Sequence, residues 1–332
     1  MDDLLRQRTG AFMRQYCGSE EEFVQKVCSL PPQAIGEIRF GFSPVWGELI
    51  SVMCMPHEMC TARGCAGVVE AMGVAVQRGA RVIGLGALTS PATGGGLRLL
   101  RHVPPGVTIT TGNAFTAAVV RRNVLEASTA LGFDRRAQVV AVVGCTGSVG
   151  VAVTQLLAQD GFRLILIGRS GRAVEHRLGD VVQSDTQRIT TAGDPAAAAR
   201  ADIVVLLTND PTAELEASHV RPRAIVIDCA QPRNVSLANV CAMRQQEVTV
   251  VEGGLVQIPG YTCTYDFGLP KGGWTFACLA ETYLFARNSN YAHSVGRAEI
   301  GTAQCLEAAA ARRGVGIRPL LSTNGKCLLP IR

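Results

Sequence analysis

Hydrophobic runs in the middle of the chain predict a parallel sheet. Five short segments are rich in β-branched and aliphatic residues and bounded by glycine or polar residues. They cover residues 138–144, 163–168, 203–208, 224–229 and 248–254. Such runs are typical of strands buried on both faces. Helical patterns separate them, most clearly at 147–159, so the alternation predicts an α/β fold with a Rossmann-like, doubly wound parallel sheet.

The residues before 136 follow a different pattern. It predicts a hairpin, a long helix, a buried strand, a mobile loop rich in turn formers, and a strand that leads into a second helix. In chain order these cover residues 37–53, 57–78, 81–88, 89–96 and 108–120. The chain after about Gly272 is helical. We expect an N-terminal α/β substrate lobe at 1–135, a Rossmann domain at 136–270 and a C-terminal helical segment at 271–332.

Composition narrows the class of protein. The chain has 332 residues, 47% of them hydrophobic, which is enough for two or three cores. No apolar run reaches the length of a membrane span, and the N-terminus lacks an apolar signal core, so we expect a cytoplasmic protein. The net charge of +5 comes without a dense basic tract, which argues against nucleic-acid binding.

The twelve cysteines predict neither disulfides nor a metal site. No CxxC pair occurs, and nothing nearby completes a zinc site around Cys54, Cys60 and Cys65. Most of these thiols are expected to be small buried groups in a reducing compartment.

A glycine-rich loop follows the first central strand. The segment AVVGCTGSVG has GxxGxxG spacing, a variant of the dinucleotide fingerprint, between a strand and a helix. The helix N-terminus would bind a pyrophosphate. The residues expected at the cofactor are Gly144, Thr146, Gly147, Ser148, Val149 and Gly150. A domain that binds no nucleotide, with glycines serving only turns and packing, is the alternative.

The end of the second central strand distinguishes the two nicotinamide cofactors. That strand ends in Arg169 and Ser170, where an NAD site usually has an acidic residue. A cation there fits a 2′-phosphate and favours NADPH. Thr208, at the end of the third strand, is a further candidate contact. The alternative is that Arg169 simply begins an exposed loop.

One thiol has a sequence context that suggests chemistry. Cys278 lies in GGWTFACLAET, at the start of a helical pattern, where the helix N-terminus and Lys271 are expected to lower its pKa. Glu281 is one turn further on; neutral it can donate a proton, and charged it opposes thiolate formation. His57 and Glu58 form a candidate acid–base pair. On spacing alone, a buried, inert cysteine and a polar helix start remain the alternatives.

These motifs together resemble one enzyme family. The chain is similar to the long-chain fatty acyl–[acyl carrier protein] reductases of cyanobacteria, which make fatty aldehydes. The shared strings, in order, are HEMCTAR, GLGALTS, ITTGN, VVGCTGSVG, VEGGLVQIPG, DFGLP and FACLAET. The resemblance implies that Cys278 accepts the acyl group from a carrier-protein or coenzyme A thioester and that NADPH reduces it. An enzyme that consumes the aldehyde is a further candidate partner.

The resemblance also suggests which residues line a substrate pocket. In this region the chain departs from the family's pattern. The loops GLGALTS and ITTGN are the candidates for its lining, through Thr89, Ser90, Thr111, Gly112 and Asn113. His57 stands where the family's string has a proline, the loop at 89–96 is glycine-rich, and aromatic residues make up only 5%. We therefore expect an altered pocket wall, which leaves a shorter, polar or amino-substituted acyl group open.

Two other functions remain open at this point. One is an NADP-dependent dehydrogenase of the shikimate or amino-acid dehydrogenase kind, which needs no covalent cysteine. The other is a non-catalytic NADPH-binding protein that docks a partner.

Overall fold

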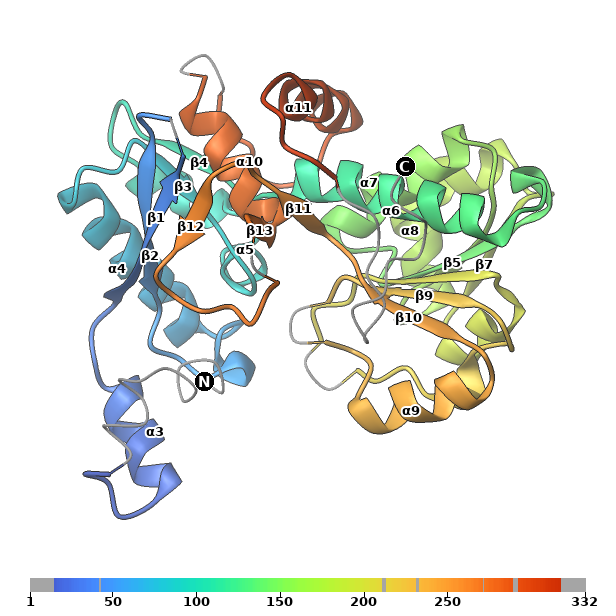
Figure 1. The fold of residues 1–332 in the computed structure, drawn as a ribbon, viewed down its shortest axis with the longest axis horizontal. Helices are drawn as coiled ribbons and strands as arrows, with labels where there is room; N and C mark the ends of the chain where they lie inside the picture. The colour runs from blue at the N-terminus through green and yellow to red at the C-terminus, as the bar shows by residue number, and fades with distance from the viewer. Residues whose placement is uncertain are drawn as a thin grey trace. The chain divides into compact units, whose positions relative to one another are not determined.

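The chain forms two compact units, each assembled from separate stretches of sequence. The computed structural model describes residues 15–41, 43–210, 213–230, 233–270, 272–288 and 292–317. Unit 1 comprises Met1–Gly112, Gln257–Gly296 and Arg313–Gly316. Unit 2 comprises Asn113–Val256, Arg297–Arg312 and Ile317–Arg332. Figure 1 shows the elements of both. The units are discontinuous, whereas the boundaries expected from the sequence are continuous.

Unit 2 is built on a six-stranded sheet in the order β10-β9-β8-β5-β6-β7. Every neighbouring pair is parallel. In chain order the strands are β5 (Val139–Val143), β6 (Arg163–Ile167), β7 (Ile189–Ala192), β8 (Ile203–Leu206), β9 (Ile225–Asp228) and β10 (Thr249–Glu252). This is the strand order of the doubly wound dinucleotide fold. The predicted fold class is therefore confirmed.

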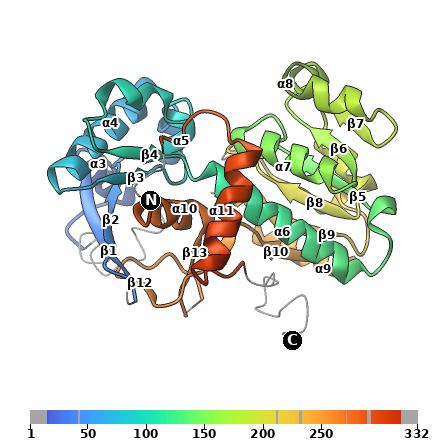
Figure 2. The same cartoon turned by 90° about the horizontal axis from the view of Figure 1, so that it is seen from above.

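The helices of unit 2 include two from outside the predicted Rossmann segment. They are α6 (Asn113–Leu131), α7 (Ser148–Gln159), α8 (Gly171–Ser184), α9 (Leu237–Gln245) and α11 (Ile300–Arg312), with single turns η3 (Arg135–Ala137), η4 (Pro195–Arg200) and η5 (Ala217–His219). Figure 2 shows α11 running beside α6. Arg121 of α6 pairs with Asp160, which ends α7, at 2.7 Å and with Glu307 of α11 at 3.7 Å. These ion pairs and apolar contacts attach α6 and α11 to unit 2.

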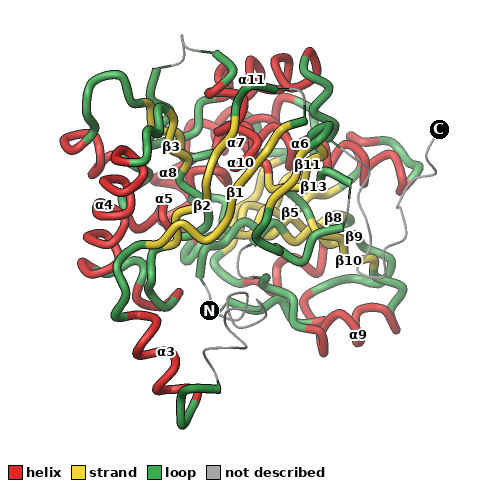
Figure 3. Tube along the Cα trace, turned by 60° about the vertical axis from the view of Figure 1, so that its left-hand side comes forward, coloured by secondary structure: helices red, strands yellow, loops and turns green. Residues whose placement is uncertain are grey.

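Unit 1 contains the predicted hairpin, completed by a third strand. The antiparallel sheet has the order β12-β1-β2, with β1 (Gln33–Phe40), β2 (Trp46–Ser51) and β12 (Tyr261–Cys263). Figure 3 shows β1 and β2 side by side. Helix α3 (Glu20–Cys28) comes first in the described chain, and the turn η1 (Pro56–Glu58) and helix α4 (Ala62–Gln77) follow the hairpin. The α-helix predicted at 57–78 is therefore shorter in the structure, because its first residues belong to the turn η1.

A second part of unit 1 carries the loops of interest. Strands β3 (Val82–Gly84) and β4 (Thr108–Thr110) pair in parallel. Between them lie the short helix α5 (Thr89–Ala92) and the 3-10 helix η2 (Leu97–His102). Strand β13 (Trp274–Phe276) precedes α10 (Ala277–Ala286), and β11 (Leu255–Gln257) lies where the chain passes from unit 2 into unit 1. The segment 89–96, expected to be a mobile loop, contains a helical turn because Thr93 Oγ1 donates to the carbonyls of Thr89 and Ser90.

None of the helices in the described ranges is long and apolar enough to cross a bilayer.

The packing of the first turn of α7 yields a stability prediction. A Cβ on Gly150 would lie 2.2 Å from the carbonyl oxygen of Gly144, so backbone would have to move. We expect Gly150→Ala to destabilise the protein by about 3 kcal/mol. The control is Gly301→Ala in α11, where nothing lies within 4 Å of the added atom. It should be neutral or stabilising by up to about 1 kcal/mol. Urea unfolding of both variants tests this, and equal effects would contradict the packing.

Candidate functional site

The loop after β5 lies at the point where the sheet changes direction. Gly144 follows the strand with a φ of +84°, a conformation that favours glycine. A Cβ there would lie 2.7 Å from the backbone nitrogen of Thr208, just beyond β8. The structure thus brings Gly144 and Thr208 together at the carboxyl ends of β5 and β8. In sheets of this order ligands bind at this edge.

The N-terminus of α7 is open. Its N-cap is Gly147, an exposed residue, and no side chain caps the helix. The Ser148 hydroxyl accepts a hydrogen bond from the Ala298 backbone at 3.0 Å, and Thr146 and Val149 are half-buried. Gly150 packs directly on the loop. A helix start that no side chain caps is suited to a phosphate.

The end of β6 is cationic, as expected. Arg169 and Arg172 are exposed, and in the described part of the chain neither forms an ion pair with a carboxylate. Ser170 caps α8, since its hydroxyl accepts from the backbone of Ala173 at 3.2 Å. No acidic side chain follows this strand directly. Such an end suits a 2′-phosphate better than a 2′-hydroxyl.

The carboxylate of Asp228, at the end of β9, stabilises the loop that follows this strand. Its carboxylate accepts backbone hydrogen bonds from Ala230, Asn234 and Val235 at 3.0–3.1 Å. Burial raises the pKa of Asp228 to about 6 in spite of these three donors. These hydrogen bonds cap the turn after β9, which accounts for a buried carboxylate at this position.

In unit 1, Cys278 is held directly against the backbone that follows β4. It is the second residue of α10. A Cβ on Gly112 would lie 2.3 Å from the Cβ of Cys278 and 2.5 Å from its Cα, and Gly112 has a φ of +74°. Only glycine therefore fits at this position. The structure brings Gly112 and Cys278 together, two of the predicted site residues.

Glu281 belongs to the same cluster. Its side chain is fully buried, and the hydroxyl of Thr110 donates to its carboxylate. The same hydroxyl accepts from the backbone N–H of Gly112 at 3.2 Å. Thr110 therefore connects the buried carboxylate to the loop that touches Cys278.

The thiol is harder to ionise than the sequence suggests. Cys278 is half-buried, and this desolvation raises its pKa to about 11, to which the negative charge of Glu281 adds. Hydrogen bonds from the backbone N–H groups of Leu279, Cys278 and Ala87 act in the opposite direction but are outweighed. The lowered pKa predicted from the helix N-terminus is therefore wrong. Lys271, which was expected to contribute to it, lies outside the described residues.

One of these donors has an unusual backbone. Ala87 is exposed and has a φ of +47°, although it is not glycine. It is the second residue of a turn in which the Gly86 carbonyl accepts from both the backbone and the hydroxyl of Thr89, at 3.1 and 2.6 Å. Holding a non-glycine residue in this region costs about 1–3 kcal/mol, and such strain is concentrated at functional sites.

The other residues predicted to line the pocket lie in different segments of the chain. Ser90 is buried in α5, and Thr111 is buried and donates its backbone N–H to Ser294 at 2.9 Å. Asn113 begins α6, in unit 2.

The predicted acid–base pair has other contacts. His57 is exposed, and Glu58 pairs with Arg63 at 3.0 Å. Within the described ranges, no hydrogen bond or ion pair joins either residue to Cys278.

Three residues of the thiol site were not identified from the sequence: Gly84, Ala87 and Thr110. A Cβ on Gly84 would lie 1.8 Å from the hydroxyl oxygen of Thr282 in α10, so β3 also contacts this helix directly. Gly84 and Ala87 lie in the GLGALTS string, but no pattern in it marks a positive φ at Ala87.

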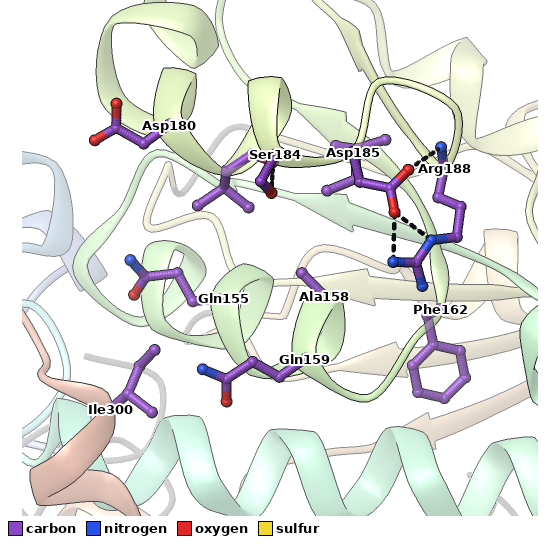
Figure 4. A pocket seen from close by; sticks show the side chains of 11 residues that line it. Gln155, Ala158, Gln159, Phe162, Asp180, Ser184, Asp185, Arg188 and Ile300 are labelled. Carbon is purple, nitrogen blue, oxygen red and sulfur yellow. Dashed lines mark hydrogen bonds and ion pairs between the residues drawn. The ribbon is translucent and has the colours of Figure 1, made fainter.

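A separate hollow of about 390 Å³ lies in unit 2 (Figure 4). Gln155 and Gln159 of α7 and the Asp185–Arg188 ion pair line it. It includes none of the predicted site residues. In the described part of the chain, no group of three or more His, Cys, Asp or Glu residues is placed to hold a metal ion.

Comparison with known proteins finds distant relatives, among them two named proteins. The chain is 28% identical over 280 residues to a long-chain acyl-[acyl-carrier-protein] reductase of Synechococcus elongatus, covering 77% of this chain and 78% of that protein. It is 26% identical over 250 residues to the aminotransferase PigE of a Serratia species. That match covers 72% of this chain but spans only 28% of the relative.

Matches to solved structures are weaker, and no protein-family model matches the chain. A dipicolinate synthase of Bacillus halodurans is 14% identical, with 47% of this chain and 62% of that chain covered and a TM-score of 0.33. Quinate dehydrogenase of Corynebacterium glutamicum is 18% identical, with 44% and 52% covered and a TM-score of 0.31. At these TM-scores neither likeness carries an argument about function.

The raised pKa of Cys278 predicts how its alkylation depends on pH. Because only the thiolate reacts, the rate with iodoacetamide should rise about tenfold per pH unit from 7 to 10. Free cysteine, with a pKa of about 8.5, is the control and should level off near pH 9–10. Peptide mapping by mass spectrometry follows Cys278 separately from the other thiols. A plateau below pH 9 would contradict the burial effect.

Proposed function

We propose that the protein is an NADPH-dependent reductase that converts an acyl thioester to an aldehyde through an acyl-cysteine intermediate on Cys278. The observation that carries this is the thiol at the start of α10, which Gly112 contacts and to which Ala87 donates. The distant homology to an acyl-carrier-protein reductase supports the same reaction. The glycine loop of unit 2 supports the cofactor.

The residues around the loop fit a dinucleotide. The uncapped start of α7 at Gly147 and Ser148 would hold the pyrophosphate, and Gly144 keeps the loop free of side chains. Arg169 would hold the 2′-phosphate, and Thr208 lies at the same sheet edge. When bound, NADPH supplies the hydride for the reduction.

Acyl transfer begins with the loss of the Cys278 proton. The sulfur attacks the thioester carbon, a new C–S bond forms, and the bond to the donor sulfur breaks. The donor leaves as a thiolate that takes up a proton. After reduction, the thiohemiacetal collapses, the C–S bond to Cys278 breaks, and the aldehyde and the free thiol are released.

Backbone donors can stabilise the charge that develops. The backbone N–H groups of Ala87 and Leu279 each act to lower the pKa of Cys278, and in the proposed reaction they would also stabilise an oxyanion on the carbon bonded to the sulfur. Fixed donors of this kind need no reorganisation during the reaction. The strained φ of Ala87 is then explained, because it orients one of them.

A proton acceptor is needed because the pKa of Cys278 is about 11. We assign this role to Glu281, one helical turn away and hydrogen-bonded to Thr110. A carboxylate that has taken up the thiol proton can later return it to the collapsing intermediate. His57 and Glu58 remain predicted acid–base candidates.

The acyl donor is proposed to be a carrier-protein or coenzyme A thioester. Thr89, Ser90, Thr111 and Gly112 are proposed to line the acyl pocket, with Asn113 following them in the chain. A downstream aldehyde-consuming enzyme is a further proposed partner.

One observation favours a second function. A half-buried thiol with a pKa of about 11 is a poor nucleophile at neutral pH, as expected if Cys278 is structural. The protein would then be a dehydrogenase that acts on a free carbonyl or alcohol without covalent catalysis.

Intact mass spectrometry distinguishes the two functions. The protein is incubated with an acyl-carrier-protein or acyl-coenzyme A thioester in the absence of NADPH. The covalent route predicts one acyl adduct per chain, lost in Cys278→Ala and retained in the control Cys60→Ala, which removes an exposed thiol. NADPH-dependent turnover of a free carbonyl without any adduct would instead support the second function.

Cofactor preference tests Arg169. We expect Arg169→Ala to weaken NADPH binding roughly tenfold or more and to leave NADH binding nearly unchanged, because only NADPH carries the 2′-phosphate. Fluorescence titration measures both affinities. Arg200→Ala, also exposed and in unit 2, is the control. Equal losses for both cofactors would mean that Arg169 does not contact the 2′-phosphate.

A further inference from the structure

The 3-10 helix η2 of unit 1 presents an unusual surface. Leu97 and Leu100 are 55% and 37% exposed, and Arg98, Arg101 and His102 are exposed as well. We call these five residues the η2 surface.

The geometry of a 3-10 helix sorts these side chains into stripes. With three residues per turn, positions three apart lie above one another. Leu97 and Leu100 therefore form an apolar stripe, and Arg98 and Arg101 form a cationic stripe beside it. Leu99 faces the opposite way and is fully buried. The helix is anchored by one leucine while two others remain in water.

The surroundings do not neutralise the cationic stripe. Between Glu70 and Glu126 the sequence contains no aspartate or glutamate. Arg101 Nε donates to His102 Nε2 at 3.0 Å, and within the described ranges neither Arg98 nor Arg101 forms an ion pair. This positive charge remains available to a partner.

The η2 surface is connected to the thiol site through adjacent residues. A Cβ on Gly96, which precedes η2, would lie 3.1 Å from the Leu85 side chain and 3.5 Å from that of Thr111. Thr111 is followed by Gly112, which contacts Cys278. A partner on this surface would be close to the acyl acceptor.

We propose that the η2 surface is the docking site for an acidic carrier protein, which sets carboxylates against Arg98 and Arg101 and an apolar ridge against Leu97 and Leu100. This rests on the proposed function, in which such a carrier delivers the acyl thioester. The small contact area suits a transient complex, since the carrier must leave after each transfer. Charge attraction raises the encounter rate. A 3-10 helix of two turns with two exposed leucines is too short for stable insertion into a lipid surface.

Binding and acyl transfer are measured separately. The variants are Arg98→Glu/Arg101→Glu and Leu97→Ser/Leu100→Ser, and the control is Arg200→Glu, an exposed arginine of unit 2. An acidic acyl carrier protein without an acyl group is titrated by fluorescence anisotropy at low and high salt. Acylation of Cys278 is then timed with the acyl carrier protein and with an uncharged N-acetylcysteamine thioester.

We expect the charge reversal to weaken carrier binding at least tenfold and to reduce its salt dependence. The leucine variant should weaken binding while preserving the salt dependence. Both should acylate normally with the small thioester, and Arg200→Glu should match the parent protein.

Four outcomes would overturn the docking site: no saturable carrier binding below about 1 mM, unchanged binding in both variants, equal losses with the small thioester, or binding of the parent protein to anionic phosphatidylserine vesicles that the charge reversal abolishes. If the carrier binds at η2 but neither thioester acylates Cys278, the docking site stands and the proposed reaction fails.

Discussion

The thiol site depends on a close approach of backbone to helix with no side chain between them. Gly112 lies against Cys278, and Gly84 lies against Thr282 one turn further along α10. The ends of β4 and β3 therefore both support the first turns of this helix. Because added atoms would collide with backbone at Gly112, the position of Cys278 is set by glycine rather than by an adaptable side chain.

Holding Cys278 in this position makes its thiol harder to ionise. The contacts that fix Cys278 also bury it, and burial together with Glu281 raises its pKa to about 11. The opposing groups are backbone donors, including the strained Ala87. In the proposed reaction these donors would stabilise the negative charge that develops during acyl transfer.

The η2 surface and the loop after β5 depend on local features of the backbone. The η2 surface depends on the helix type, because a 3-10 helix aligns residues three apart and so separates the leucines from the arginines. The loop after β5 depends on the open start of α7 and on Gly144, whose backbone lies against Thr208. In each case local backbone geometry determines which groups are accessible.

The sequence by itself determined the central strands, the glycine loop, the cationic end of β6 and the start of α10 near Cys278, because these depend on local hydrophobic runs and spacing. Tertiary structure decided the rest. Strand β7 escaped prediction because it is short and half-exposed, and α6 and α11 join unit 2 through contacts such as Arg121 with Asp160 and Glu307. The pKa of Cys278 and the φ of Ala87 were likewise not readable from the chain, because burial and strain arise from residues that meet only when it folds.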